Sequence, residues 1–290
     1  MMRRVVPLLA AVALLWTGLA AAQGRKPPLP PGLDPGGVAI AILSTGIDYT
    51  LSDIAQRLAR DGEGQLIGWD FVDNDIRPFN SKSADTPAAW GGDGNALVRG
   101  IGRPGRRVVA VRIDTRDPVS LAKAVAFVAQ TPARVVVVPM WSGAASDWAA
   151  FAMAAKAFPD LLFIVAAGDE GRDIDREPVW PAAFGLANVL VVSAPIAPGG
   201  DASMRANTGA KTVAAIVEGR GETVGPPQDS RQAAVAAADA LATCWPQLLQ
   251  RLRGEALKDA LLAEVAKVRP GLEKPFIERC AERAATPTQR

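Results

Sequence analysis

The sequence contains no histidine at any of its 290 positions. Histidine is the usual general base of hydrolases near neutral pH, and it is also the commonest metal ligand in proteins. Its absence excludes a Ser-His-Asp or Cys-His mechanism, and it excludes most zinc sites as well. Any general base in this chain must therefore be a different kind of side chain.

Long apolar runs are also lacking beyond the N-terminus. Arg3 and Arg4 precede an apolar run over residues 5–19, and the small residues 20–22 then provide a site that signal peptidase recognises. We expect residues 1–22 to be a signal peptide cut after Ala22, which predicts a secreted or periplasmic protein. An uncleaved N-terminal anchor is the alternative. Later apolar runs are only of strand length, so we expect no membrane contact after cleavage.

The chain has no excess charge of one sign and few cysteines. Its 32 basic and 30 acidic residues give a net charge of +2, which predicts no nucleic-acid partner. The two cysteines, Cys244 and Cys280, are an even number in a chain expected to be exported. An oxidising compartment favours a disulfide between them, and two unrelated buried thiols are the alternative.

Apolar strand-length runs alternate with helical patterns along most of the chain. The runs cover residues 38–43, 65–71, 107–113, 135–140, 161–167, 188–194 and 211–218, with helical patterns at 51–59, 118–130 and 146–157. This alternation predicts an α/β fold, a doubly wound parallel sheet with helices on both faces. Functional groups in such sheets gather at the carboxyl ends of the strands.

The flanking segments differ in composition. Residues 23–37 are rich in proline and glycine and are expected to form an extended lead-in to an α/β domain over residues 38–245. Helical patterns follow at 230–252, 255–268 and 273–283, and Pro246 should break the first of them after Trp245. We expect residues 246–290 to form a C-terminal helical extension.

Five blocks at the ends of the predicted strands carry a family resemblance. They are residues 38–48 (VAIAILSTGID), 68–75 (GWDFVDND), 92–96 (GDGNA), 162–171 (LFIVAAGDEG), and 179–183 (VWPAA) leading to 188–194 (NVLVVSA). In order and spacing they resemble the subtilisin-like serine proteases. The resemblance covers most of the chain and implies the subtilisin fold.

At every position where the resemblance implies a catalytic group, this chain carries another residue. Ser44 stands where the family has the aspartate of its triad, and Asp93 where it has the histidine. Asp169 occupies the position of the oxyanion asparagine. Asp229, with Ser230 one residue further on, falls at the position of the nucleophile. The chain thus resembles a degenerate member of the family that lacks the catalytic triad.

These replacements remove the chemistry of peptide hydrolysis. A serine hydroxyl needs an adjacent base, and the carboxylate of Asp93 is far less basic than imidazole. A carboxylate at Asp169 would repel a developing oxyanion, where an amide donor contributes about 3–4 kcal/mol. We therefore predict an exported pseudoprotease, without enzymatic activity, that binds an as yet unknown protein or peptide.

The resemblance also places a peptide groove. Trp141, Ser142 and Gly143 fall in the segment that lines the substrate groove of the relatives, and an extended peptide can pair with such a strand through backbone groups alone. The indole of Trp141 would plug this groove or cover a bound peptide, unless it simply packs in the core.

Two alternatives concern the aspartates. Serine-carboxyl proteases (sedolisins) share this fold and use acidic residues, which would make Ser230 the nucleophile of an acid endopeptidase with Asp93 and Asp169. That family pairs two carboxylates one helical turn apart, and Leu97 stands at the second position. Alternatively, Asp93, Asp169 and Asp229 form an acidic pocket for an amine or a cation, unless they are solvated carboxylates without a role. A remnant that stabilises a larger assembly is a further alternative.

The segment around Asp70, Asp73 and Asp75 resembles the calcium-binding loop of some thermostable subtilisins. Alternating carboxylates supply the hard oxygens that calcium prefers. However, Arg77 and Phe79 stand where further oxygen ligands would follow, and an arginine is unfavourable beside a cation. We therefore expect a turn capped by aspartates and no cofactor, with calcium as the alternative.

Overall fold

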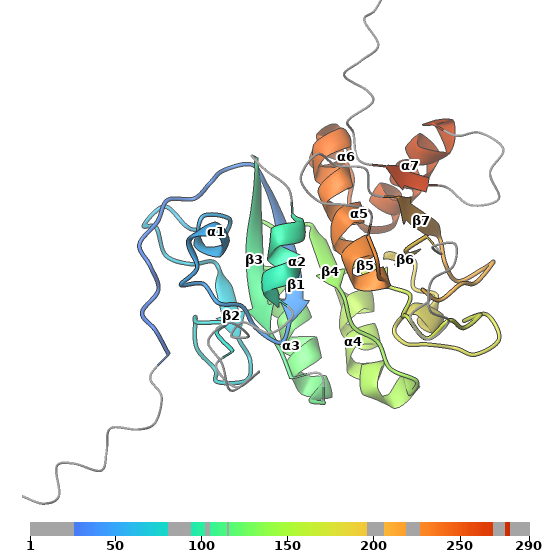
Figure 1. Ribbon diagram of the computed structural model, residues 1–290, viewed down its shortest axis with the longest axis horizontal. Coiled ribbons are helices and arrows are strands. Elements are labelled where there is room, and N and C mark those ends of the chain that lie inside the picture. Colours follow the sequence, from blue (N-terminus) through green and yellow to red (C-terminus); the bar gives the residue numbers. More distant parts are fainter. Residues whose placement is uncertain are drawn as a thin grey trace, which may run out of the picture.

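A computed structural model describes residues 26–80, 94–101, 105–114, 116–195, 206–218, 227–268 and 276–278. Within these residues the chain forms an eight-stranded sheet, in which every pair of neighbouring strands is parallel (Figure 1). The order across the sheet is β2-β3-β1-β4-β5-β6-β7-β8. The strands are β1 (Val38–Ser44), β2 (Gly68–Asp70), β3 (Arg106–Arg112), β4 (Val135–Val138), β5 (Leu162–Ala166), β6 (Val189–Ser193), β7 (Ala215–Glu218) and β8 (Phe276–Glu278).

Helices cover both faces of this sheet. They are α1 (Ser52–Ala55), α2 (Gly94–Gly100), α3 (Pro118–Val128), α4 (Ala145–Ala157), α5 (Ser230–Cys244), α6 (Pro246–Arg251) and α7 (Gly254–Val268), with one 3₁₀ turn, η2 (Ala182–Phe184). Successive side chains of a strand point to opposite faces. Ile40 and Ile42 therefore join the core beneath α2, α5 and α7, while Ala41 and Leu43 join the core beneath α3 and α4. The predicted doubly wound parallel sheet is confirmed.

Two predicted helices differ in the structure. Helix α1 ends at Ala55, well before residue 59, because the following backbone turns to pair with β3: the amide of Ala59 donates to the carbonyl of Val108 over 2.8 Å. Within the predicted helix over 273–283, residues 276–278 instead form strand β8, so the helical prediction is wrong there. This segment gains a backbone ladder with β7, and Ile277 is fully buried.

The helices after Pro246 pack on the same core as the strands. Pro246 begins α6 and separates it from α5, as predicted. Leu257 and Leu261 of α7 are buried in the cluster that contains the α5 side chains. Gly254 opens α7 with φ at +47°, and a Cβ at this position would lie 1.8 Å from the carbonyl oxygen of Pro159. Only glycine allows this close approach between α7 and the loop before β5.

Several predicted features lie at or beyond the described residues. Cys244 is the last residue of α5, but Cys280 lies outside the described residues, so the disulfide between them stays a prediction. The expected signal peptide over residues 1–22 also lies outside them. In the part of the chain that the structure describes, no helix has both the length and the apolar character needed to cross a membrane.

Candidate functional site

The carboxyl end of β1 carries Ser44 in a fully packed environment. Ser44 is 1% exposed, and its hydroxyl accepts a hydrogen bond from the amide of Gly46 at 3.2 Å. Gly94, the first residue of α2, lies directly above it: a Cβ there would be 2.9 Å from Ser44 Oγ and 2.1 Å from the carbonyl oxygen of Gly46. Asp93 precedes Gly94 and lies outside the described residues. Ser44 thus closes a tight turn beneath the start of α2.

Ser230 and Asp169 meet where α5 begins beside the end of β5. The amide of Ser230 donates to Asp169 Oδ1 at 2.8 Å, and its hydroxyl donates to Asp169 Oδ2 at 3.1 Å. The same hydroxyl oxygen accepts a hydrogen bond from the amide of Gly168 at 3.0 Å. Ser230 itself is fully buried. Gly168 has a φ of +97°, which a glycine adopts without strain. The hydroxyl therefore joins the strand end to the helix start.

Burial governs the ionisation of Asp169. Removal from water raises the pKa of its carboxyl above the ordinary value of 3.8, although the two hydrogen bonds from Ser230 oppose this change. The neighbouring carboxylate of Asp229 raises the pKa further, and the guanidinium of Arg231 lowers it. Asp169 is thus a carboxyl group whose proton is held more tightly in the folded chain than in water.

The structure brings together two of the three aspartates predicted for an acidic pocket. Asp229 is the N-cap of α5, and its Oδ1 accepts a hydrogen bond from the amide of Gln232 at 2.8 Å. Asp169 accepts from the amide of Ser230, the first residue of α5. Both carboxylates therefore face the positive end of the α5 dipole, where anions are stabilised. The third aspartate, Asp93, lies outside the described residues.

A pocket of about 390 Å³ opens beside this helix start, at the end of β4. Its wall includes the side chains of Arg116, Trp141, Ser142, Asp147, Trp148 and Arg231. Trp141 and Ser142, which the family resemblance assigned to a peptide groove, lie in the wall of this pocket, whereas Gly143 is exposed and does not line it.

The indole of Trp141 is half-buried and held on two sides. Its N–H donates to the carboxylate of Glu170, and the guanidinium of Arg231 lies over the ring, 5.9 Å from the centroid. The latter distance is that of a cation–π contact. Ser142 pairs its backbone with Trp180 through two hydrogen bonds of 2.9 Å. Within the described ranges, the main-chain groups of Trp141 form no hydrogen bond.

Asn207 organises the loop around Asp169, although nothing in the sequence pattern identified it. It is fully buried, and its Nδ2 donates to the carbonyl of Ala167 at 2.9 Å and to Glu170 Oε2 at 2.6 Å. Its Oδ1 accepts from the amides of Glu170 and Arg172 at 3.1 and 2.9 Å. A single amide side chain thereby fixes the loop that follows β5. Asn207 is distant from β5 in the sequence, and only the folded structure shows that its side chain lies at the end of this strand.

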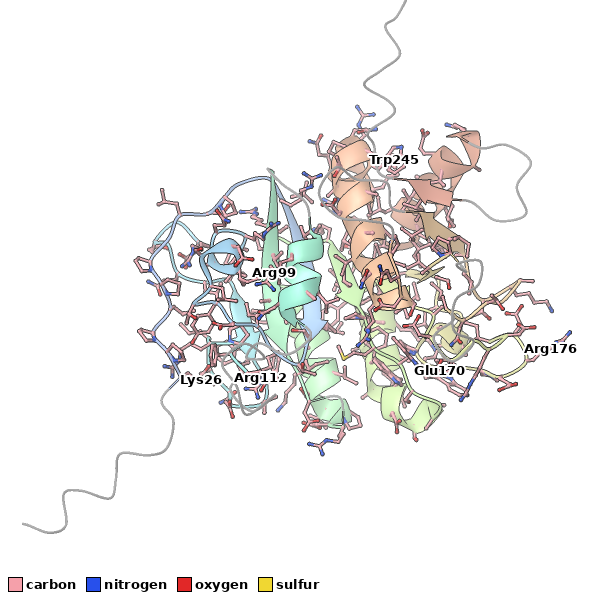
Figure 2. The ribbon with its side chains drawn as sticks, viewed as in Figure 1. Lys26, Arg99, Arg112, Glu170, Arg176 and Trp245 are labelled. Carbon is pink, nitrogen blue, oxygen red and sulfur yellow. The ribbon has the colours of Figure 1, made fainter. Side chains whose placement is uncertain are left out.

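The acidic turn after β2 is filled by cationic side chains of the same chain. Lys26 Nζ forms ion pairs with Asp70, Asp73 and Asp75, and Arg112 Nη1 lies 2.8 Å from Asp70 Oδ2 and 2.7 Å from Asp73 Oδ2. Figure 2 shows Lys26 and Arg112 at this corner of the molecule. Burial opposes ionisation of Asp73, but the neighbouring cationic side chains of Arg112 and Lys26 outweigh it and hold the pKa of Asp73 below its usual range.

The residues of this turn do not fit a calcium ion. The carboxylate oxygens that would bind the ion already contact an ammonium and a guanidinium group. Among the described residues, no group of three histidine, cysteine or acidic side chains is arranged to hold a metal. Asp70 instead caps the turn, accepting from the amides of Val72 and Asp73 at 2.8 and 2.9 Å. This is the capped turn that we expected, with a lysine partner that we did not.

The order of the strands and the helices on both faces define a subtilisin-like α/β fold. A cold-adapted subtilisin-like serine proteinase superposes with a TM-score of 0.59 at 18% identity, over 87% of this chain and 92% of that one. A lanthipeptide protease gives 0.60 at 16% identity, over 85% and 84%. A prenylagaramide maturation protease gives 0.52 at 16% identity, over 78% and 82%. No protein-family model and no curated sequence matches the chain.

Proposed function

We propose that this chain is an exported, subtilisin-like protein without proteolytic activity, and that it binds an extended peptide segment of a protein partner. The observation that carries the proposal is the state of the Ser230 hydroxyl. It is fully buried, it donates to Asp169, and it accepts from Gly168. A hydroxyl in this environment acts as a structural link between β5 and α5, and no peptide carbonyl can approach it.

The lack of a base supports the same conclusion. The sequence contains no histidine, so Ser230 has no imidazole to take its proton. The carboxylate that the hydroxyl does contact, Asp169, occupies the position from which the related enzymes stabilise the oxyanion. Its negative charge would oppose the negative oxygen of a tetrahedral intermediate. At this position Asp169 thus carries a carboxylate that repels the oxyanion, where the related enzymes carry an amide that stabilises it.

Peptide binding is supported by the pocket at the end of β4. The main-chain groups of Trp141, which form no hydrogen bond within the described ranges, can pair with an extended peptide, since strand addition requires only main-chain donors and acceptors. The indoles of Trp141 and Trp148 and the cations Arg116 and Arg231 supply apolar and polar walls for one side chain of that peptide. These contacts require none of the groups that hydrolysis requires.

One observation favours an acid endopeptidase as a second candidate. The hydroxyl of Ser230 donates directly to Asp169, and burial raises the pKa of that carboxyl, as an enzyme active in acid would require. The second carboxylate of such a site is missing, however, because Leu97 occupies its position and is 4% exposed within the core. The two candidates differ in one measurable property, the reactivity of the hydroxyl.

The first experiment measures that reactivity. The mature chain is treated with a serine-directed fluorophosphonate and, separately, with a peptide library from pH 3 to pH 9. We expect no adduct on Ser230 and no cleavage, because the hydroxyl is buried and has no imidazole to take its proton. A covalent adduct at Ser230, or cleavage that Ser230→Ala abolishes, would show that Ser230 is a nucleophile, and cleavage confined to low pH would establish the acid endopeptidase.

The second experiment measures binding. A random peptide library displayed on phage is selected on the immobilised chain, and the selected clones are tested against two variants. We expect Trp141→Ala to weaken the binding of these clones by about tenfold or more, the effect of losing an aromatic anchor. Met153→Ala, which removes an exposed apolar side chain of α4, is the matched control and should bind as the unaltered chain does. Equal binding by all three proteins would refute the assigned groove.

A further inference from the structure

The acidic turn after β2 and the segment that leads into β1 form a single unit. We call residues 26–37 the N-terminal strap. It runs along the side of the molecule where α1 and the edge strand β2 lie (Figure 1). We propose that Lys26 of this strap is the resident cation of the acidic turn, so that a covalently attached ammonium group replaces a bound metal ion.

The contacts of Lys26 match the donors of an ammonium group. Its Nζ donates to Asp70 Oδ2, to Asp75 Oδ1 at 3.2 Å and to the carbonyl oxygen of Arg77 at 2.9 Å. An ammonium group has three N–H donors, and these three acceptors use all of them. Asp73 Oδ2 lies 3.2 Å away as a further counter-charge. The Lys26 side chain is only 10% exposed, which excludes an incidental surface contact.

The charges of the turn are balanced without any added ion. Asp70, Asp73 and Asp75 supply three negative charges. Lys26 and Arg112 are paired with them, and the third cation, Arg77, lies 3.4 Å from Asp75 Oδ2. A divalent cation would add two positive charges to a neutral cluster, and it would have to displace the ammonium group to reach its oxygens.

Asp70 makes the strap necessary for the fold. Its side chain is fully buried, and its two oxygens accept from two backbone amides, from Arg112 and from Lys26. A buried carboxylate is tolerated only while its partners remain in place. The strap is therefore held where it begins by a charge that the core cannot leave unpaired.

Further contacts fix the strap along its length. The hydroxyl of Tyr49 donates to the carbonyl of Pro27 at 2.6 Å, and Arg60 Nη2 donates to the carbonyl of Pro30 at 3.0 Å. Near its end, Asp34 Oδ2 accepts from Arg107 Nη1 at 2.8 Å. Because these contacts already hold the strap in place, placing the ammonium group of Lys26 in the turn costs little additional conformational entropy.

The test compares Lys26→Met with Lys123→Met, which replaces an exposed lysine of α3. We expect excess EDTA and millimolar calcium to leave the Tm of the unaltered chain unchanged. Lys26→Met should lower the Tm by about 6 °C or more, since it leaves buried carboxylate charge unpaired, and Lys123→Met should leave it unchanged. A Tm of the unaltered chain that rises with calcium or falls with EDTA would overturn the proposal, as would a Lys26→Met variant as stable as its control.

A measurement on the unaltered chain remains decisive if Lys26→Met does not fold. The native protein is acetylated with an amine-reactive ester, and the rate at each lysine is followed by mass spectrometry. We expect Lys26 to react at least about tenfold more slowly than Lys123, because reaction requires the buried ion pairs to open. Equal rates at the two lysines would show that the ammonium group is free in solution and would refute the proposal.

Discussion

The substitution Ser230→Ala separates the two roles that a serine at this position can have. As a nucleophile, Ser230 would be needed for activity and its loss would leave the fold intact. In the structure, its hydroxyl instead joins the start of α5 to Gly168 and Asp169 of the loop after β5. We therefore expect the substitution to reduce stability and to have no effect on a hydrolytic rate.

The magnitude follows from the two bonds that the hydroxyl makes. Without Oγ, the buried amide of Gly168 loses its acceptor, which costs about 1–3 kcal/mol. Asp169 loses a hydroxyl donor to a carboxylate, a bond that contributes about 1.5–3 kcal/mol. The two losses share one atom and partly overlap, so the free energy of unfolding should fall by about 2–5 kcal/mol. For a chain of this size this corresponds to a fall in Tm of about 4–20 °C.

Thermal unfolding followed by circular dichroism measures this change. Ser146→Ala is the matched control, because Ser146 is an exposed residue near the start of α4 and its substitution should change stability by no more than about 0.5 kcal/mol. If Ser230→Ala unfolds at the same temperature as this control, the hydroxyl is not the structural link described above. A loss of peptidase activity in the same variant would then identify Ser230 as a nucleophile.

Two further substitutions test the electrostatics. Because burial raises the pKa of Asp169 above 3.8, its stabilising contribution is present at low pH and is lost as the pH rises through the folded-state pKa. Asp169→Asn keeps one oxygen that accepts from Ser230 and removes the charge, so its stability relative to the unaltered chain should be greatest at pH 7 and should decrease toward pH 4. Urea denaturation between these pH values checks this, and a constant difference would contradict it. Asp239→Ala breaks the buried ion pair with Arg106, 3.2 Å away and 8% exposed, so it should destabilise the fold by about 3–5 kcal/mol, again by urea denaturation. An unchanged midpoint would show that the pair contributes nothing.

The strands were predictable because their signal is local. A strand buried on both faces reads as a continuous apolar run, and β1, β4 and β5 all lie within such runs. The ends of elements depend on tertiary contacts and were less predictable. Helix α1 stops early because Ala59 pairs with β3, a partner that is distant in the sequence. The Phe-Ile segment at residues 276–277 becomes a strand because β7 offers a free edge there.

The sequence indicated which residues lie at the candidate site, but it did not indicate that the hydroxyl of Ser230 is buried. Aligning the family blocks placed Asp169 at the oxyanion position and Asp229, followed by Ser230, at the nucleophile position, and in the structure Ser230 contacts Asp169. That the hydroxyl is buried could not be read from the sequence, since this depends on the loop that Asn207 holds in place. Lys26 was missed for a similar reason. It lies in a proline-rich lead-in, whose composition predicts an extended chain and carries no information about what that chain touches.

An ammonium group that is part of the polypeptide cannot dissociate when the surroundings are diluted or depleted of minerals. A bound metal ion stabilises a fold in proportion to its concentration outside, and its effect disappears when that concentration falls below the dissociation constant. Lys26 is present at one equivalent per molecule under all conditions. The acidic turn therefore keeps its cation at any concentration of calcium or magnesium, and chelating agents cannot unfold the protein by removing it.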